Sequence, residues 1–133
     1  MMIEFREVNP DDYDQLRQFL SGQGWADRLR DVDRFRMMIE GADRTVIALE
    51  GERIVGFARA LCDGASNGYI SILAVAADRR KRGIGRSLVE RLMSGDAEGH
   101  ITWVLRAGRD SSGFWTRLGF SSSSIAMELV RKK

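Results

Sequence analysis

The chain has 133 residues, of which 44% are hydrophobic and 30% are charged, with a formal net charge of +2. These values predict one globular domain over residues 1–133. No apolar run approaches the roughly 20 residues of a membrane span, so we expect no membrane partner. A single cysteine excludes an internal disulfide and favours a cytoplasmic protein. The chain also has only one histidine, so we expect no metal site.

The charges are unevenly distributed along the chain. Residues 1–70 hold 9 basic and 13 acidic side chains (net −4), and residues 71–133 hold 12 basic and 6 acidic ones (net +6). This predicts a basic half for a polyanionic ligand and an acidic half for a cationic acceptor. Nucleic acid is the competing ligand for the basic half. Because the basic residues cluster in one turn without a stripe of aromatic residues, we expect no nucleic-acid partner.

The first 40 residues predict a strand followed by two helical regions. Residues 3–8 favour the strand, and residues 9–12 form a turn into a helix that Asp11 or Asp12 would cap. The second helical region covers residues 25–40. Its aromatic and methionine side chains, among them Trp25, either belong to the core or line a pocket for an acceptor, and the usual burial of such residues favours the core.

The middle of the chain predicts a hairpin and then a buried strand. Two apolar segments, 45–49 and 54–61, are separated by a short polar turn, which indicates antiparallel strands. A loop of small polar residues covers 62–68. The run from Ile70 to Ala77, broken only by a serine, suits a strand buried on both faces that pairs antiparallel with the strand before it.

A basic turn follows this buried strand and leads into an amphipathic helix over 84–93. Gly83 and Gly85 lie at the helix N-terminus, where backbone N–H groups have no intrahelical partner and the macrodipole favours an anion. We interpret this turn as a site for a ligand with several phosphates, and a solvated surface loop is the alternative. Basic side chains surround it: Arg79, Arg80, Lys81, Arg82 and Arg86.

Three further elements are predicted beyond that helix. Residues 101–105 favour a strand, and residues 111–118 favour a short helix that Asp110 would cap. Residues 125–130 are predicted to close the chain as a last strand. The whole chain is therefore expected to be an α/β (α+β) domain, and a homodimer through the last strand or an exposed apolar face is one possible assembly.

Two segments resemble motifs of the GNAT superfamily of N-acyltransferases. Residues 75–85, with Arg-Lys-Arg-Gly-Ile-Gly at their end, are similar to motif A, and residues 113–120, Gly-Phe-Trp-Thr-Arg-Leu-Gly-Phe, resemble the family's F-Y-x-x-x-G-F segment. The resemblance implies a mixed, mostly antiparallel sheet of about six or seven strands with about four helices. It also implies an acetyl-CoA-dependent N-acetyltransferase whose acceptor is a primary amine of a small molecule or a protein.

The resemblance further implies where acetyl-CoA binds. Backbone groups of the buried strand hold the pantetheine arm, and backbone N–H groups of the turn hold the pyrophosphate. The expected cofactor-binding residues are Leu73, Ala74, Val75, Arg80, Lys81, Arg82, Gly83, Ile84, Gly85, Arg86, Ser87, Asp110, Gly113 and Phe114.

The acid and the base are harder to assign. The tyrosine that the family is commonly proposed to use as an acid is replaced here by Trp115, whose indole N–H is a poor acid. Tyr69 and Asp63 are the candidates for a base, although both suit ordinary turns. Three interpretations stay open: the thiolate leaves with hydrogen bonding alone, Ser111 or Ser112 assists it, or the protein is an acyl-CoA-binding module with little or no turnover.

Overall fold

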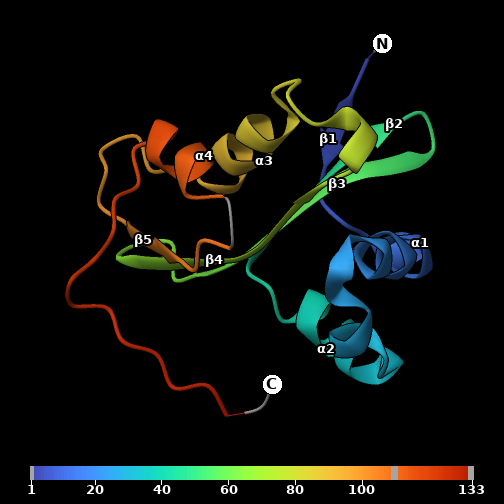
Figure 1. Ribbon diagram of the computed structural model, residues 1–133, viewed down its shortest axis with the longest axis horizontal. Coiled ribbons are helices and arrows are strands. Elements are labelled where there is room, and N and C mark those ends of the chain that lie inside the picture. The colour runs from blue at the N-terminus through green and yellow to red at the C-terminus, as the bar shows by residue number, and fades with distance from the viewer. Residues whose placement is uncertain (1, 109–110, 132–133) are drawn as a thin grey trace.

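The structure, a computed structural model, describes residues 2–108 and 111–131. Five strands form one sheet in the order β1-β2-β3-β4-β5 (Figure 1). The first four strands run antiparallel to their neighbours, and β5 runs parallel to β4. The predicted fold class is confirmed, with five strands in place of six or seven. Their bounds are β1 Glu4–Arg6, β2 Arg44–Glu50, β3 Arg53–Cys62, β4 Asn67–Val75 and β5 Thr102–Leu105.

Helices cover both faces of the sheet. On one face lie α1 (Tyr13–Leu20) and α2 (Val32–Glu40), and on the other lie α3 (Ile84–Leu92) and α4 (Ser112–Arg117) (Figure 1). Each face has its own apolar cluster, so the middle of β3 and β4 is buried on both sides. The four helices match the expected number. Within the described ranges, no helix combines the length and apolar character that crossing a bilayer requires.

The chain enters α1 through a short 3-10 turn, Pro10–Asp12, that is fixed by a capping box. The side chain of Asn9 accepts a hydrogen bond from the backbone N–H of Asp11, and Asp12 accepts one from the backbone N–H of Asn9 at 2.8 Å. Asp12 also accepts two hydrogen bonds from the guanidinium of Arg6, at 2.8 and 2.9 Å. Asp12 thus stands at the N-cap position of α1, as predicted, but its side chain does not cap that helix, and the capping side chain is Asn9 at the start of the 3-10 turn.

The predicted helical region 25–40 is divided into separate pieces. A π-helical turn, Ser21–Trp25, follows α1 directly and contains Gly24 in the left-handed region with a φ of 93°. A 3-10 helix, Ala26–Leu29, comes next. Asp31 then starts α2 by accepting two backbone N–H groups at 3.0 and 3.1 Å. Because Asp31 has an extended backbone, the helical conformation of the preceding 3-10 helix does not continue into α2.

The predicted last strand, Ile125–Val130, is wrong for this chain. The segment has no strand partner among the described residues and lies apart from the sheet as irregular coil in Figure 1, although Glu128 forms an ion pair with Arg106, just after β5, at 2.8 Å. Ile125, Met127 and Leu129 are 87%, 95% and 76% exposed. Alternating apolar residues favour a strand only where a neighbouring edge and an apolar surface receive them. The chain's own sheet does not receive this segment.

Candidate functional site

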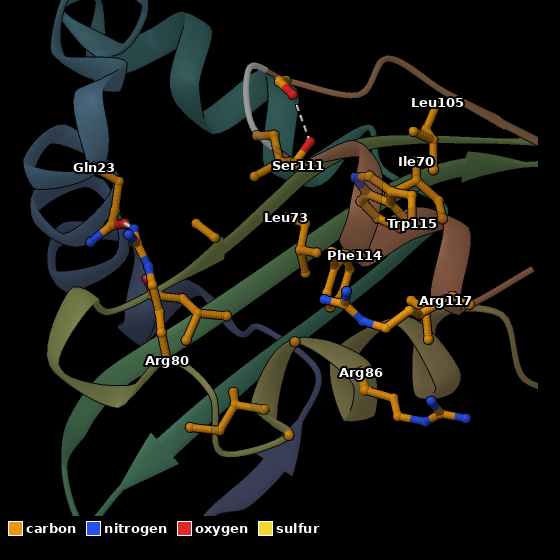
Figure 2. A pocket seen from close by; sticks show the side chains of 18 of the residues that line it. Gln23, Ile70, Leu73, Arg80, Arg86, Leu105, Ser111, Phe114, Trp115 and Arg117 are labelled. Atoms are coloured by element: carbon orange, nitrogen blue, oxygen red, sulfur yellow. Dashed lines mark hydrogen bonds between the residues drawn. The ribbon is translucent and has the colours of Figure 1, made fainter. Parts of the chain in front are cut away.

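The site is the cleft where β4 parts from β5. The two strands pair only between residues 67–70 and residues 102–105, and β4 then continues to Val75 without its neighbour. A cavity of about 1050 Å³ lies at this point, bordered by β4, the turn before α3, and α4 (Figure 2). The free backbone edge of β4 offers N–H and C=O groups along one wall of the cavity, where a ligand can bind as an added strand would.

A β-bulge at Ser71 marks the point where the strands part. The register with β3 changes from Arg59↔Ile72 to Ala60↔Ile70, so that Ser71 is the extra residue. As a result, Ile70 packs in the cluster beside α3, and Ile72 packs in the cluster beside α1 and α2. The Ser71 hydroxyl accepts a hydrogen bond from Arg59 at 2.5 Å. Bulges bend a strand locally, which explains why β4 leaves β5 here.

The turn between β4 and α3 presents backbone N–H groups to the cavity. Lys81 and Gly83 both have left-handed backbones, with φ of 65° and 82°. The first intrahelical bond runs from the N–H of Ser87 to the carbonyl of Gly83 at 3.0 Å, so the N–H groups of residues 84–86 have no helical partner by position. A Cβ on Gly83 would meet nothing within 4 Å, which leaves room for an anion.

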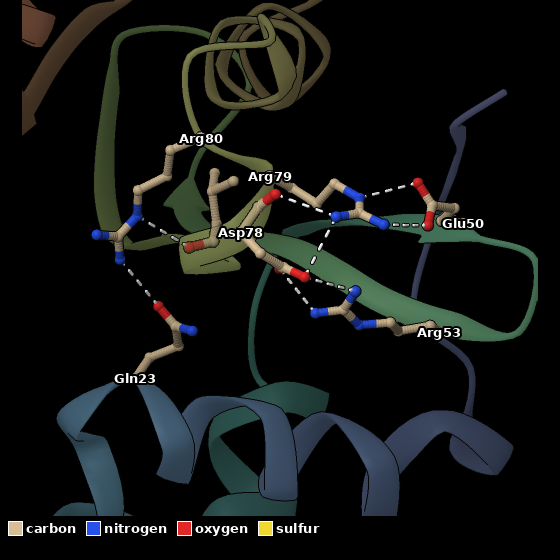
Figure 3. A network of polar contacts seen from close by, with 7 residues as sticks. Gln23, Glu50, Arg53, Asp78, Arg79 and Arg80 are labelled. Atoms are coloured by element: carbon tan, nitrogen blue, oxygen red, sulfur yellow. Dashed lines mark hydrogen bonds and ion pairs between the residues drawn. The ribbon is translucent and has the colours of Figure 1, made fainter. Parts of the chain in front are cut away.

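Part of the basic turn is neutralised by an ionic network (Figure 3). Arg79 donates two hydrogen bonds to Glu50, at 2.7 and 3.0 Å, and a further one to Asp78. The bond from Arg79 lowers the pKa of Glu50. Arg53 holds Asp78 at 2.8 and 3.1 Å. Contrary to expectation, Arg79 is therefore not mobile charge for a ligand, and it fixes the turn to the β2–β3 hairpin.

Arg80 spans the cavity mouth between two distant parts of the chain. Its Nε donates to the carbonyl of Val75, and its Nη2 donates to the side chain of Gln23, both at 3.3 Å (Figures 2 and 3). Neither Arg80 nor Lys81 forms an ion pair with any described residue, and both line the cavity. These two cations are therefore available to an anionic ligand.

Aromatic packing joins α4 to the cavity wall. The Trp115 ring is only 7% exposed and makes edge-on contacts with Phe114 and Phe120, with centroid distances of 5.0 and 5.3 Å. Phe114 in turn contacts Gly85, where a Cβ would lie 3.2 Å from the ring. Trp115 thus borders the cavity mainly as a core residue.

The cavity gathers most, though not all, of the predicted site residues. Those that do not line it are Arg82, Ser87, Gly113 and the base candidate Tyr69. Asp110 lies outside the described residues. The predicted residues that line it are Leu73, Ala74, Val75, Arg80, Lys81, Gly83, Ile84, Gly85, Arg86, Phe114 and Trp115.

Several lining residues were not foreseen. They include Gln23 on the π-helical turn, Ser71 at the bulge, Arg106 just after β5, and Arg117 on α4. The one available signal was Ser71, a polar residue inside an otherwise apolar strand. Bulges are frequent next to active sites, where they redirect a side chain. The neighbouring Trp25, named as a pocket candidate, does line the cavity.

No acid or base is evident in the described part of the cavity lining, which contains no Asp, Glu, His, Cys or Tyr. The Asp63 carboxylate instead accepts hydrogen bonds from residues 65–67 of its own loop, and these bonds hold its pKa far below the usual range. It is therefore ionised at neutral pH but too weak a base to deprotonate an amine. The Ser111 hydroxyl lines the cavity and donates to the carbonyl of Gly108 at 2.8 Å (Figure 2).

The fold is a mostly antiparallel sheet whose one parallel pair parts at a cleft, with a glycine-containing turn between β4 and α3. The sequence model of the Acetyltransferase (GNAT) domain matches residues 41–122. The chain therefore belongs to the GNAT acetyltransferase family, as the resemblance implied.

Solved structures agree with this assignment. A protein assigned as an acetyltransferase from Deinococcus radiodurans R1 is 28% identical, with 97% of this chain and 88% of that chain covered and a TM-score of 0.74. A GNAT-family acetyltransferase from Streptococcus pneumoniae TIGR4 is 19% identical, with 99% and 98% covered and a TM-score of 0.77. The second likeness shows the fold alone. No curated protein matches the chain.

Proposed function

We propose that the protein transfers the acetyl group of acetyl-CoA to a primary amine of a small molecule or a protein. The observation that carries this proposal is the free edge of β4, which leads directly into the turn at the start of α3. The residues present fit acetyl-CoA. Gly83 leaves open space beside the helix N-terminus, and Arg80 and Lys81 supply positive charge next to it.

Each part of the cavity has a proposed task. The N–H groups of residues 84–86 bind the pyrophosphate, and backbone groups of residues 73–75 bind the pantetheine arm. The amine nitrogen then forms a bond to the thioester carbonyl carbon, the carbon–sulfur bond breaks, and the thiolate leaves, while the proton that the nitrogen loses passes through water to the thiolate. Proximity and orientation supply a large part of such a rate enhancement. The side chains that line the described cavity hold the reactants in place and offer no strong base.

The proposed acceptor is an amine of either a small molecule or a protein, and one alternative function competes with the proposal. A free amine is mostly protonated at neutral pH and must lose a proton before it attacks. Because Trp115 replaces the family's tyrosine and the described lining has no carboxylate, an acyl-CoA-binding module without turnover is the alternative. Thiol release from acetyl-CoA in the presence of an amine distinguishes the two functions.

The first experiment is calorimetry of acetyl-CoA binding to the wild type and to Gly83→Asp. The new carboxylate would stand where phosphate oxygens are expected, so we expect binding to weaken at least about 10-fold through like-charge repulsion. Gly99→Asp is the matched control. Gly99 also has a positive φ (73°) and nothing within 4 Å of a Cβ, and it does not line the cavity.

The outcomes separate binding from folding. If both variants lose binding equally, backbone strain and not the phosphate site is responsible. If the wild type does not bind acetyl-CoA, the proposed function is wrong. If it binds, thiol release is measured with a panel of amines, and no release with any of them favours the binding module.

Two broader expectations belong to the same proposal. We propose that the protein resides in the cytoplasm. Its single cysteine, Cys62, is a free thiol, and the reducing cytoplasm keeps thiols in this form. We also propose that the protein self-associates. The large apolar side chains that stay exposed on the C-terminal segment support this.

A further inference from the structure

The cavity reaches both faces of the sheet. On the face of α3 and α4 it is lined by Ile70 and Leu73, which pack in the apolar cluster there. On the opposite face it is lined by Ile72 and Ala74, which pack in the cluster beside α1 and α2. The turn with the proposed phosphate site lies on the first face, before α3. Because a bound cofactor would occupy that side, the end beside α1 and α2 is the one that stays open to an acceptor.

The cavity offers no negative charge to an acceptor. Its described lining contains arginines and a lysine but no aspartate or glutamate. The acidic surface that was expected for a cationic acceptor does not border this part of the molecule. A molecule whose only charge is that of its amine would therefore meet like charge. An acceptor that also carries an anionic group would be attracted instead.

One half-buried guanidinium at the acceptor end lacks a counter-ion. Arg59 lies on β3 opposite Ile72 of β4, on the face of α1 and α2. Its Nε donates to the carbonyl of Met38 in α2 at 2.9 Å, and its Nη1 donates to the Ser71 hydroxyl at 2.5 Å. It forms no ion pair with any residue that the structure describes.

The guanidinium of Arg59 keeps unused donors. Of its five N–H groups, only one on Nε and one on Nη1 donate to described residues. Burial lowers the pKa of Arg59, and Tyr69 and Asp43 oppose this shift, while an arginine side chain stays protonated in proteins. The Asp43 carboxylate accepts the backbone N–H of Cys62 at 2.7 Å and does not pair with Arg59. A charge that is partly removed from water without a partner is costly, so an anionic ligand would stabilise it.

Arg44 shows how an arginine of the same sheet serves the fold alone. It lies on β2, and its Nη1 donates to the carbonyls of Leu92 and Ser94 at the end of α3, at 2.9 and 2.8 Å. Arg44 does not line the cavity. Arg59 instead gives one of its two bonds to Ser71, which does line it. Because the Ser71 oxygen accepts this bond, its own proton is free to be donated to a ligand.

We propose that the acceptor is a free amino acid whose carboxylate is held by Arg59 and by the hydroxyl of Ser71. This inference rests on the proposed function, because it names the acceptor of that reaction. One guanidinium with one hydroxyl matches a single carboxylate. Ser71 precedes Leu73, the first residue of the proposed pantetheine site, by two positions or about 7 Å of strand. So short a separation suits a carboxylate on the carbon next to the amine.

The first test compares each common L-amino acid with its α-amide, which keeps the amine and the side chain but lacks the anionic carboxylate. Binding to the wild type with CoA present is measured by ligand-observed NMR titration. At least one amino acid should bind about 10-fold or more tightly than its amide, as expected for a charge-assisted hydrogen bond. Equal binding of acid and amide, or no binding of any amino acid, overturns the proposal.

Variants then assign the preference to its residues. Arg59→Gln should remove it, and Arg44→Gln is the matched control that should keep it, since both lose a guanidinium that bonds the carbonyl of a helix. Calorimetry with acetyl-CoA shows that each variant is folded. Ser71→Ala is a milder second variant and should weaken amino-acid binding about 3-fold or more. A preference that survives in Arg59→Gln, or in Ser71→Ala if Arg59→Gln does not fold, contradicts the assignment.

Thiol release separates this inference from the proposed function. With acetyl-CoA, release should be faster with the amino acid that binds than with its amide, and Arg59→Gln should raise KM for the amino acid more than it lowers kcat. Faster release with the amide overturns the acceptor class and leaves acetyl transfer supported. Binding of the amino acid without any release supports the carboxylate site and counts against acetyl transfer.

Discussion

The ring of Phe114 rests on the bare α-carbon of Gly85, so that a Cβ there would lie 3.2 and 3.3 Å from two ring carbons. Gly85 is in the first turn of α3 and Phe114 is in α4, so this contact joins the two helices beside the cavity. Phe114 thus gives Gly85 a packing role that is independent of phosphate binding.

Gly85→Ala is expected to lower the free energy of unfolding because of this contact. Overpacking costs about 1–3 kcal/mol, and the better helix propensity of alanine returns roughly 1 kcal/mol of it. In a Phe114→Leu background the penalty should largely disappear, since the smaller side chain leaves room. Denaturant unfolding of the four proteins measures this coupling, and an equal cost in both backgrounds would contradict it.

Arg80 and Arg82 are predicted to differ although they are neighbours in the motif. Arg80 lines the cavity and Arg82 does not. We expect Arg80→Gln to weaken acetyl-CoA binding about 10-fold, as the loss of a charge-assisted hydrogen bond would, and Arg82→Gln to have less than about a 3-fold effect. Calorimetry at two salt concentrations checks this. Equal losses would mean that long-range charge alone attracts the ligand.

Replacement of Trp115 tests whether the missing acid limits turnover. Trp115→Tyr restores the family's hydroxyl, and Trp115→Phe is the matched variant without it. Both open a space beside Phe120 and should lower the melting temperature similarly. If an active wild type is limited by thiolate protonation, kcat of the tyrosine variant exceeds that of the phenylalanine variant by at least about 10-fold. Equal kcat values would exclude this limitation.

Asp12 is expected to make stability depend on pH at the acidic end. The hydrogen bonds from Arg6 and the backbone of Asn9 lower the pKa of Asp12 below its usual 3.8. The contribution is therefore complete above that value and is lost as the pH falls through the lower, folded-state pKa. Asp12→Asn should cost about 1–2 kcal/mol at neutral pH, and this difference should shrink as the pH falls below 3.8.

Thermal unfolding of the Asp12 variant at a series of pH values measures this effect. Asp14→Asn is the control, because Asp14 is an exposed acid on α1 that forms no ion pair with the described residues. A difference between the wild type and Asp12→Asn that stays constant down to about pH 2 would contradict the prediction.

The hairpin and the motif A unit were predictable because their signals are local. The two apolar segments of 45–61 with the polar turn between them, and the apolar run before the basic turn, each determine their own element. The last strand was mispredicted because residues 125–130 are mostly apolar but no neighbouring strand pairs with them in the part of the chain that the structure describes. Strand formation depends on a neighbouring edge, and sequence periodicity does not show where that edge is.

The site was predictable at its phosphate end and less so at the other end. The turn and α3 come from one continuous segment, whereas Gln23, Ser71 and Arg106 come from three distant segments that only the folded sheet brings together. The ion pair that neutralises Arg79 could not be predicted for the same reason. Its partner Glu50 is 29 residues away, on a strand that meets the turn only in the folded structure.

The arrangement of β4 and β5 also has a consequence for how the domain assembles. The four antiparallel strands include hairpins that close short loops, whereas β5 pairs with β4 only after α3 has crossed over between them. Contacts between distant segments form late, because the loop must close before they stabilise the chain. The cleft is thus expected among the last parts of the domain to form and the first to open. A ligand that binds both of its walls would protect the amides of β5 from hydrogen exchange.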